Sequence, residues 1–248
     1  MILNVSVPAS WKELTQEQMR YALFLLASGH YEPEQIKSLC LIRWGGLHPK
    51  EHVTGGYEVE HEGSIFVIRP EQLAAFLPVM DFLTDIPDEP VRLEHIQGCR
   101  ALFPADLQGL PFESWLAVEN LYQGYIRTRR TDLVQSMAAV LYEKGKKPLR
   151  LTPAEAYGVF LWVAAVKRLF AQRFPSFFVS APVDEQQQDT FTMLRKAMNT
   201  QIRALTKGDI TKEKEILSLD VWRALTELDA QAEEYNELKI QYADAGKS

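Results

Sequence analysis

Apolar residues recur at steps of three and four positions through most of this chain of 248 residues, a pattern typical of amphipathic α-helices. Thr15 and Gln18 form a capping-box pattern that opens the first predicted helix, and Gly29 ends it. A second helix is predicted from Pro33 to Trp44, just before a pair of glycines. The same periodicity predicts further helices over residues 70–83, 111–128, 131–143, 153–173, 185–206 and 219–242.

A different pattern interrupts the helical periodicity near the N-terminus. Residues 57–61 alternate in polarity, residues 64–68 are β-branched and aromatic, and Glu62-Gly63 between them favours a turn. Because an isolated hairpin is only marginally stable in water, the alternating segment 2–7 is a candidate for a third strand. The expected fold class is therefore mainly α, with a bundle-like helical body and a small N-terminal antiparallel hairpin or three-stranded sheet.

A proline-rich acidic segment at residues 85–90 is the best candidate for a domain boundary. It predicts a small α+β region over residues 1–86 and a helical domain over residues 87–248, with one continuous domain as the alternative. The segment from 91 to 109 fits either irregular structure or one short helix.

The most apolar stretch, residues 156–166, predicts a buried central helix rather than a membrane span. It is 11 residues long, whereas a span needs about 20 apolar residues. Thr152, Pro153 and Glu155 give this helix a start signature of capping residue, proline and first-turn acid.

Composition indicates a folded cytoplasmic protein. Hydrophobic residues make up 46% of the chain and charged residues 24%, which is the balance of a globular protein rather than a disordered one. The two cysteines, Cys40 and Cys99, are too few for a secreted disulfide framework. The N-terminus also lacks the basic start and apolar run of a signal peptide. No membrane association is expected.

Charge is spread unevenly along the chain, which raises nucleic-acid binding as an alternative function. Residues 127–207 contain 14 Lys and Arg against 6 Asp and Glu, although the whole chain has a net charge of −6. Tyr122 and Tyr125 lie next to these cations, and such pairs can bind phosphate and stack on bases. Both tyrosines also fit the apolar stripe of one helix with Trp115, which favours a core role and counts against nucleic acid as a partner. The candidate nucleic-acid-binding residues are Arg127, Arg129, Arg130, Lys144, Lys146 and Lys147.

No catalytic, cofactor-binding or metal-binding site is predicted, and the chain is not expected to be an enzyme. Neither a phosphate-binding glycine loop nor a nucleophile elbow occurs in the sequence. His48 and His52 stand four apart, with Cys40 upstream and His61 downstream, a set that a zinc site could use. Pro49 and the flanking glycine pairs instead favour exposed histidines in a loop.

The last predicted helix has an apolar stripe that continues to its end. Val221, Leu225 and Leu228 begin the stripe, and Tyr235, Leu238 and Tyr242 continue it, with glutamates on the opposite face. Because two heptads are too few to indicate a coiled coil, docking on the protein's own core is favoured over a face reserved for a partner.

Several segments resemble tail-assembly and related morphogenesis proteins of phages and prophages of Bacteroides-type bacteria. They are the opening from Val7 to Gln18 (VPASWKELTQEQ), the segments Phe112–Tyr125 and Phe174–Phe178, and the stretches 206–209, 212–217 and 222–228. The resemblance implies a helical, non-enzymatic protein that binds other phage tail or assembly proteins. It would act as a chaperone for tape-measure or tube subunits in the host cytoplasm, or as a structural virion component. Homo-oligomerisation is left open.

Overall fold

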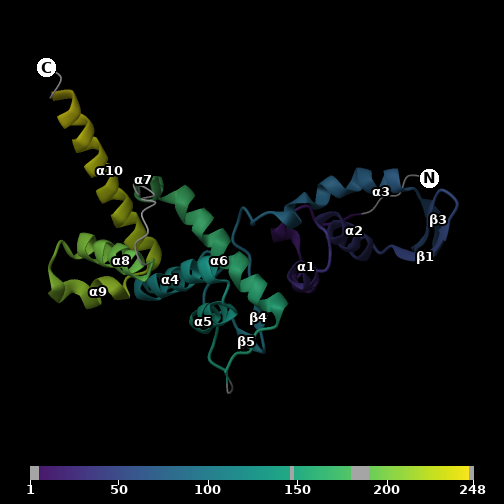
Figure 1. Cartoon of the computed structure of the whole chain (residues 1–248), viewed down its shortest axis with the longest axis horizontal. Helices are drawn as coiled ribbons and strands as arrows, with labels where there is room; N and C mark the ends of the chain where they lie inside the picture. The colour runs from purple at the N-terminus through teal and green to yellow at the C-terminus, as the bar shows by residue number, and fades with distance from the viewer. Residues whose placement is uncertain (1–5, 146–147, 180–189, 246–248) are drawn as a thin grey trace. The chain divides into compact units, whose positions relative to one another are not determined.

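The computed structural model describes residues 6–145, 148–179 and 190–245 of the chain. Within these residues the protein is mainly helical, and its strands form a three-stranded antiparallel sheet and a two-stranded one (Figure 1). The predicted fold class, mainly α with a small antiparallel sheet, is confirmed.

Contacts divide the described residues into two compact units, each made of two separate stretches of chain. Unit 1 contains the residues up to 100 together with 148–165, and unit 2 contains residues 101–145 together with those from 166 onward. The long helix α6 (Pro153–Arg173) supplies residues to both units. The boundary at residue 86 stays a prediction, because the units are defined by contacts and not by consecutive ranges.

Two helices with clear start signals open unit 1. After a short 3₁₀ turn (η1, Trp11–Glu13), α1 (Gln16–Ser28) begins behind Thr15, whose hydroxyl accepts a hydrogen bond from the Gln18 N–H at 3.2 Å. The Gln18 side chain accepts one in return from the Thr15 N–H at 2.9 Å. Gly29 then ends α1 in the left-handed conformation, with φ 64°. The second helix, α2 (Pro33–Trp44), occupies its predicted range.

The three-stranded sheet consists of β1 (His48–Val53), β2 (Gly56–His61) and β3 (Ser64–Ile68) in that order. The β2–β3 hairpin is the predicted one, and its turn has positive φ at Glu62 (50°) and Gly63 (75°), as a type I′ turn requires. The prediction that segment 2–7 supplies the third strand is not met, because β1 takes that place. Residues 6 and 7 are not in a strand, and residues 1–5 lie outside the described residues.

The segment from 70 to 84 is a helix that changes type part of the way along. It was predicted as one helix over 70–83, whereas the structure has α3 (Pro70–Phe76) followed by the 3₁₀ helix η2 (Leu77–Thr84). Pro78 lacks the N–H that would continue the α3 hydrogen-bond pattern, but it is tolerated in the first turn of η2, where a backbone N–H has no partner within the helix.

The segment that had no firm sequence signal, 91–109, contains a second hairpin of β4 (His95–Ile96) and β5 (Cys99–Arg100). Its two-residue turn has positive φ at Gln97 (46°) and Gly98 (77°). The Glu155 side chain, from the start of α6, accepts hydrogen bonds from this turn. Of the two interpretations of 91–109, the short helix is wrong, and the segment is irregular apart from this short β-hairpin.

Glu155 is only 7% exposed. Its carboxylate accepts hydrogen bonds from the N–H and hydroxyl of Thr152 at 2.9 and 3.0 Å, and so completes the capping box of α6. It also accepts bonds from the backbone N–H of Gln97 at 3.1 Å and from the Gln97 amide at 2.6 Å. Burial raises the pKa of the Glu155 carboxyl, but these hydrogen bonds outweigh burial and leave the pKa below its ordinary value.

One turn further along α6, Gly158 allows a close approach between elements of unit 1. A Cβ atom at this position would lie 2.9 Å from Leu23 Cδ1 and 3.4 Å from Leu93 Cδ1. Glycine lowers helix stability by about 1 kcal/mol relative to alanine. Glycine at position 158 therefore leaves room for the end of the Leu23 side chain, at a small cost in helix stability.

Unit 2 is helical, and its helices follow the predicted order. The predicted ranges 111–128, 131–143, 153–173 and 219–242 agree with the structure to within three residues. For the range 185–206, the structure has a helix from residue 190, and residues 185–189 lie outside the described residues. The elements besides α6 are α4 (Phe112–Thr128), α5 (Thr131–Leu141), α7 (Pro175–Val179), α8 (Thr190–Thr206), η3 (Ile210–Lys212), α9 (Glu213–Ser218) and α10 (Val221–Ala245).

Aromatic side chains occupy the centre of unit 2. The Phe170 ring meets Trp115 edge-on with centroids 4.9 Å apart, and it meets Trp222 in the same way at 5.3 Å. Phe174 completes the cluster at 5.7 Å from Trp222. The indole N–H of Trp222 is satisfied by the carbonyl of Asp106 at 2.9 Å. The cluster joins α4, α6 and α10 in one core.

Among the residues that the structure describes, none of the helices combines the length and the apolar character that crossing a bilayer requires.

The Glu155 network predicts acid-sensitive stability. Replacing Glu155 with Gln removes the charge and turns an acceptor into a donor facing other donors, so we expect the free energy of unfolding at pH 7 to fall by about 2 kcal/mol. Because the folded-state pKa is lowered, the stabilisation is present above the ordinary glutamate pKa and is lost as pH falls through the folded value. Urea unfolding at pH 7 and pH 3 measures this difference.

Glu89→Gln is the matched control, because the Glu89 side chain is 66% exposed in a surface ion pair with Lys12. We expect this variant to stay within about 0.5 kcal/mol of the parent at either pH. An equal loss for both variants at pH 7, or a Glu155→Gln loss that does not shrink as the pH falls below the ordinary glutamate pKa, would contradict the assigned role.

The thiol of Cys40 is expected to be inert in the folded protein. Its side chain is fully buried in α2, and burial raises its pKa to about 12. In a Cys99→Ser variant, Ellman's reagent at pH 8 should therefore label Cys40 only after unfolding in urea, which should release one thiol per chain. Rapid labelling of the folded variant would contradict the packing of α2 described here.

Candidate protein-binding groove in unit 1

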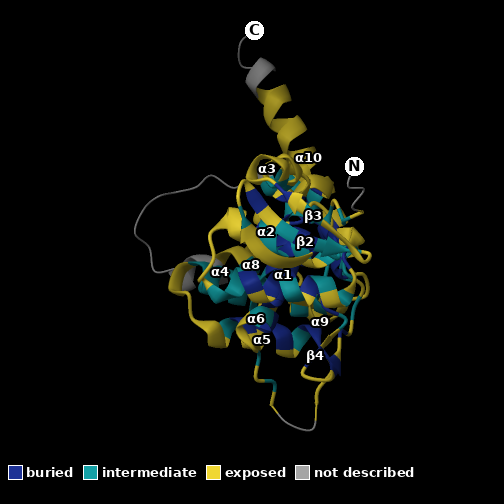
Figure 2. Ribbon diagram, turned by 90° about the vertical axis from the view of Figure 1, so that its right-hand side faces the viewer, coloured by how far each residue is buried: buried dark blue, intermediate teal, exposed yellow. Residues whose placement is uncertain are grey.

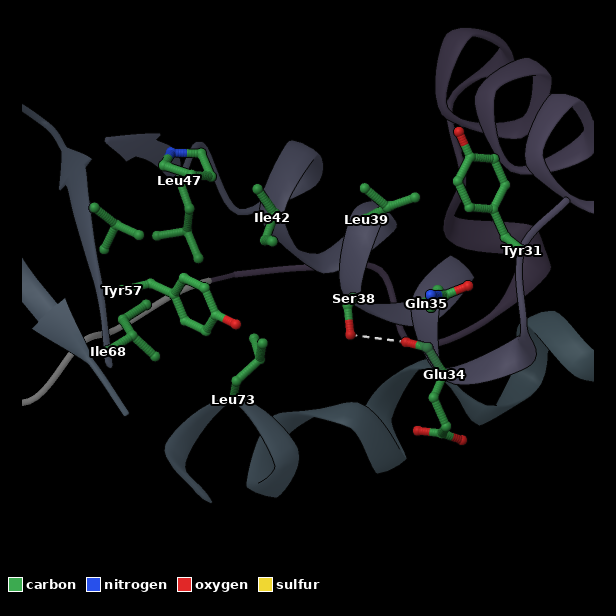
Figure 3. Close-up of a pocket in the computed structure, with 12 residues that line it drawn as sticks. Tyr31, Glu34, Gln35, Ser38, Leu39, Ile42, Leu47, Tyr57, Ile68 and Leu73 are labelled. Atoms are coloured by element: carbon green, nitrogen blue, oxygen red, sulfur yellow. Dashed lines mark hydrogen bonds between the residues drawn. The ribbon is translucent and has the colours of Figure 1, made fainter. Parts of the chain in front are cut away.

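An apolar groove lies between α2, the three-stranded sheet and α3, with a cavity volume of about 540 Å³ (Figure 3). It is formed entirely by residues of unit 1. The lining residues are Tyr31, Glu34, Gln35, Ser38, Leu39, Ile42, Leu47, Pro49, Tyr57, Val59, Ile68 and Leu73.

The floor of the groove is a small hydrophobic cluster of its own. Leu47, Val59 and Ile68 are 5%, 4% and 8% exposed, and the half-buried Ile42 and Leu73 pack against them. The β2–β3 register explains this arrangement, because it pairs Tyr57 with Ile68 and so places their side chains on one face of the sheet. Strand pairing and the approach of two helices thus create one continuous apolar surface.

Two tyrosines lie at the ends of the groove. Tyr31 is 41% exposed and Tyr57 is 45% exposed. Figure 3 shows their rings at opposite ends of the lining, with the Tyr57 ring projecting from its strand over the hollow. The edge of the His52 imidazole meets the Tyr57 ring at a centroid distance of 5.1 Å and supports it from β1. Partly exposed tyrosines with an apolar body and a polar tip are typical of protein interfaces.

The polar side of the groove is supplied by the first turns of α2. The Ser38 hydroxyl donates to the backbone carbonyl of Glu34 at 2.7 Å (Figure 3), and the Gln35 side chain accepts from the Glu32 N–H at 2.9 Å. The Glu34 carboxylate pairs with Lys37 at 2.7 Å. These groups are engaged within α2 and its capping box. The groove therefore offers mainly apolar contact to a ligand.

Lys37 joins α2 to the segment that follows α3. The residue is only 8% exposed, and its ammonium pairs with Asp81 at 2.7 Å as well as with Glu34. Hydrogen bonds from the ammonium to Asp81 and then to Glu34 raise its pKa, against a smaller lowering by burial. The ion pair connects α2, which lines the groove, to η2.

The histidine and cysteine residues considered for zinc do not come together. His48 and His52 lie on strand β1, Cys40 is fully buried in α2, and His61 Nδ1 lies 3.2 Å from the Gly46 carbonyl oxygen. The prediction that His48 and His52 lie in a loop is wrong, because a sheet edge tolerates Pro49 and a register shift between Pro49 and His52 accommodates it. Within the described ranges, no group of three or more His, Cys, Asp or Glu side chains could hold a metal ion.

The candidate nucleic-acid-binding residues fall into separate groups. Arg127, Arg129 and Arg130 are exposed around the junction of α4 and α5. Lys144 is also exposed but follows the far end of α5, whose 11 residues correspond to about 16 Å of helix. Lys146 and Lys147 lie outside the described residues. The structure therefore brings three arginines together and separates Lys144 from them.

Two of these arginines have local partners. The Arg130 guanidinium binds both carboxylate oxygens of Asp132, at 3.1 and 2.6 Å, and lowers the pKa of that carboxyl. Arg129 lies over the Tyr125 ring, 5.9 Å from its centroid. Tyr122 and Tyr125 are themselves half-buried. Nucleic-acid binding by this region stays a prediction.

The groove was missed at the level of sequence because its lining comes from separate stretches of chain. Each stretch by itself has the pattern of ordinary core. One signal was present in α2, where Leu39 and Ile42 lie on a different face from the buried Ile36 and Cys40. A short helix with apolar residues on two faces contacts apolar surface on both sides. In α2 one face packs into the core and the other lines the groove.

Comparison with known proteins adds no relative from which a role for the groove could be transferred. No protein-family model matches the chain, and searches of curated proteins and of solved structures find no match either.

Proposed function

We propose that this protein acts by binding another protein, and that the groove of unit 1 receives apolar side chains of that partner. The carrying observation is the open apolar floor of Leu47, Val59 and Ile68 between two partly exposed tyrosines, Tyr31 and Tyr57. A small-molecule site of this volume usually adds a few convergent polar groups that orient the ligand. Here the polar groups of α2 are hydrogen-bonded within their own helix and its cap. The groove therefore suits a partner that binds mainly through apolar contacts.

An amphipathic helix is the partner segment that suits the groove. The groove lies over one face of the sheet, so an occupant meets side chains and not a strand edge. A helix lays apolar residues into such a surface at steps of three and four positions. Full burial of each large apolar side chain stabilises the complex by about 1.5–3 kcal/mol before the cost of association is subtracted.

The sharper form of the proposal takes the partner from the sequence resemblance described above. In that form the protein belongs to phage tail assembly, and the partner is a tube or tape-measure subunit. The protein would act as an assembly chaperone in the cytoplasm of the host bacterium, or remain in the virion as a structural component. Nucleic-acid binding remains the alternative, and the separation of Lys144 from the three arginines does not favour it.

Photo-crosslinking inside phage-producing cells tests both forms. We expect a benzoylphenylalanine side chain at Tyr57 to capture a tail-tube or tape-measure protein, identified by mass spectrometry. The same group at Ile65 should not, because Ile65 is 62% exposed but lies on the opposite face of the sheet. Capture of a specific protein that is not a virion or assembly protein would reject the phage role alone. Equal capture from both positions, or from neither, would reject the groove as the binding surface.

Binding measurements on a captured partner give a second prediction. Tyr57→Ala should weaken the complex by at least about tenfold, since truncation of a tyrosine that anchors an interface typically costs about 2 kcal/mol or more. Ile65→Ala should change the affinity by less than about twofold, as expected for a residue outside the interface. Isothermal titration calorimetry measures the affinities, and thermal unfolding checks that both variants remain folded. An unchanged affinity for Tyr57→Ala would contradict the proposed site.

A further inference from the structure

The C-terminal helix α10 has two halves that differ in burial. In its first half Val221, Ala224 and Leu228 are at most 4% exposed and pack within unit 2. In its second half Tyr235 is 67% exposed and Tyr242 is 76% exposed. Figure 2 shows the outer part of the helix in the colour of exposed residues, apart from its last turn. The apolar stripe therefore continues beyond the surface that covers it.

The stripe has the seven-residue repeat of a helix pair. Val221, Leu228, Tyr235 and Tyr242 follow one another at intervals of seven, which are the a positions of a heptad. Leu238, 51% exposed, lies three residues after Tyr235, at a d position. Leucine at d suits a two-stranded parallel pair. The first half of this seam is filled by the protein's own unit, and the second half is open within the described residues.

The open half belongs to a helix that is already fixed in place. The Asp220 carboxylate caps α10 by accepting from the Trp222 N–H at 2.9 Å, and it also accepts from the Gly109 N–H at 2.6 Å. The Asp229 carboxylate accepts from the Phe177 N–H at 2.8 Å, which ties the middle of α10 to α7. Pairing would therefore not have to form the helix first, which is the step that makes short isolated helices marginal.

Charges beside the seam distinguish between possible occupants. Glu234 lies directly before the a position Tyr235, and Lys239 lies four residues after it. In a parallel pair of identical helices these positions face one another across the seam, so that Glu234 of each copy meets Lys239 of the other. In an antiparallel pair each position faces its own kind, and neither ion pair forms.

We propose that the outer half of α10 pairs in parallel with the same segment of a second copy of this chain. Tyr235, Leu238 and Tyr242 form the seam, and two symmetric Glu234–Lys239 pairs flank it. The seam has only about two heptads, fewer than an independent coiled coil needs, so the dimer is weak and depends on protein concentration. The inference is independent of the groove, because it uses residues of unit 2 alone.

Disulfide trapping tests the seam and its direction. In a parallel pair the d positions of the two copies face each other, so Leu238→Cys should form a cross-linked dimer under mild oxidation. Ile240→Cys is the matched control, because Ile240 is 62% exposed on the same helix but lies away from the seam. The natural cysteines Cys40 and Cys99 are buried. We expect at least about tenfold more dimer from Leu238→Cys than from Ile240→Cys on non-reducing gels.

Equal trapping of the two variants, or no trapping of Leu238→Cys at chain concentrations up to about 0.1 mM, would overturn the proposal. A chain that sediments as a monomer throughout that range would also overturn it, and would leave the seam to a different protein. A dimer by sedimentation that Leu238→Cys cannot trap would overturn the parallel arrangement.

Charge reversal supplies an independent test in the unmodified seam. Lys239→Glu should weaken dimerisation by about fivefold or more in sedimentation experiments at low salt, because Glu234 of each copy then meets a like charge on the other. The double variant Glu234→Lys with Lys239→Glu should restore the dimer to within about twofold, since the ion pairs re-form with their signs exchanged. Failure of the double variant to recover would contradict the assigned register.

Discussion

A carboxylate inside a protein is stable only when hydrogen-bond donors surround it, and Glu155 meets this condition at the start of α6. Two donors come from Thr152, one turn before it, and two come from Gln97 in the β4–β5 turn. The same oxygens thus bind donors at the start of α6 and hold a distant turn with positive φ. Because side chains follow one another at fixed angular steps along a helix, anchoring the first turn of α6 also orients the side chains of the turns next to it.

Unit 2 uses the same device with a different acid. Asp220 caps α10 and accepts a hydrogen bond from the backbone of Gly109, far away in the sequence. Phe112 and Val221 reinforce the junction through backbone hydrogen bonds to Leu219 and Leu110, at 2.7 and 2.9 Å. In both units a carboxylate at a helix start satisfies local donors and a remote one. These hydrogen bonds position the helix starts in addition to the packing of the apolar faces.

Local signals account for what could be predicted from sequence. Helix starts such as Thr15 and Thr152, helix ends such as Gly29, and the turn at Glu62-Gly63 act within four residues, so their effect can be recognised without knowing the fold. Strand β1 was missed because Pro49 disfavours a strand unless it lies at an edge, and edge position is a property of the sheet. The β4–β5 turn was missed because Gln97 has positive φ, which Glu155 stabilises from outside the local sequence.

The groove could not be predicted for a related reason. Leu47, Val59, Ile68 and Leu73 each fit an ordinary core pattern, and only the packing of α2 and α3 on the sheet leaves part of this surface open. The stripe of α10 was visible along the sequence, but the prediction that it docks on the protein's own core holds only for the first half of the helix and is wrong for the second half. Whether the protein's own core covers Tyr235 and Tyr242 depends on where the neighbouring helices end. The local sequence pattern of α10 carries no information about those ends.

Gly158 has a consequence for how this chain can change over evolutionary time. Alanine at most helix positions is a favourable exchange for glycine, and it needs a single mutational step. At position 158 the added methyl group would lie 2.9 Å from Leu23 Cδ1, so the end of that side chain must move before the exchange is accommodated, whereas Leu93 Cδ1 at 3.4 Å would be in ordinary contact. Positions 158 and 23 are therefore expected to vary together among descendants of this sequence, because the room beside Gly158 is taken by the end of the Leu23 side chain.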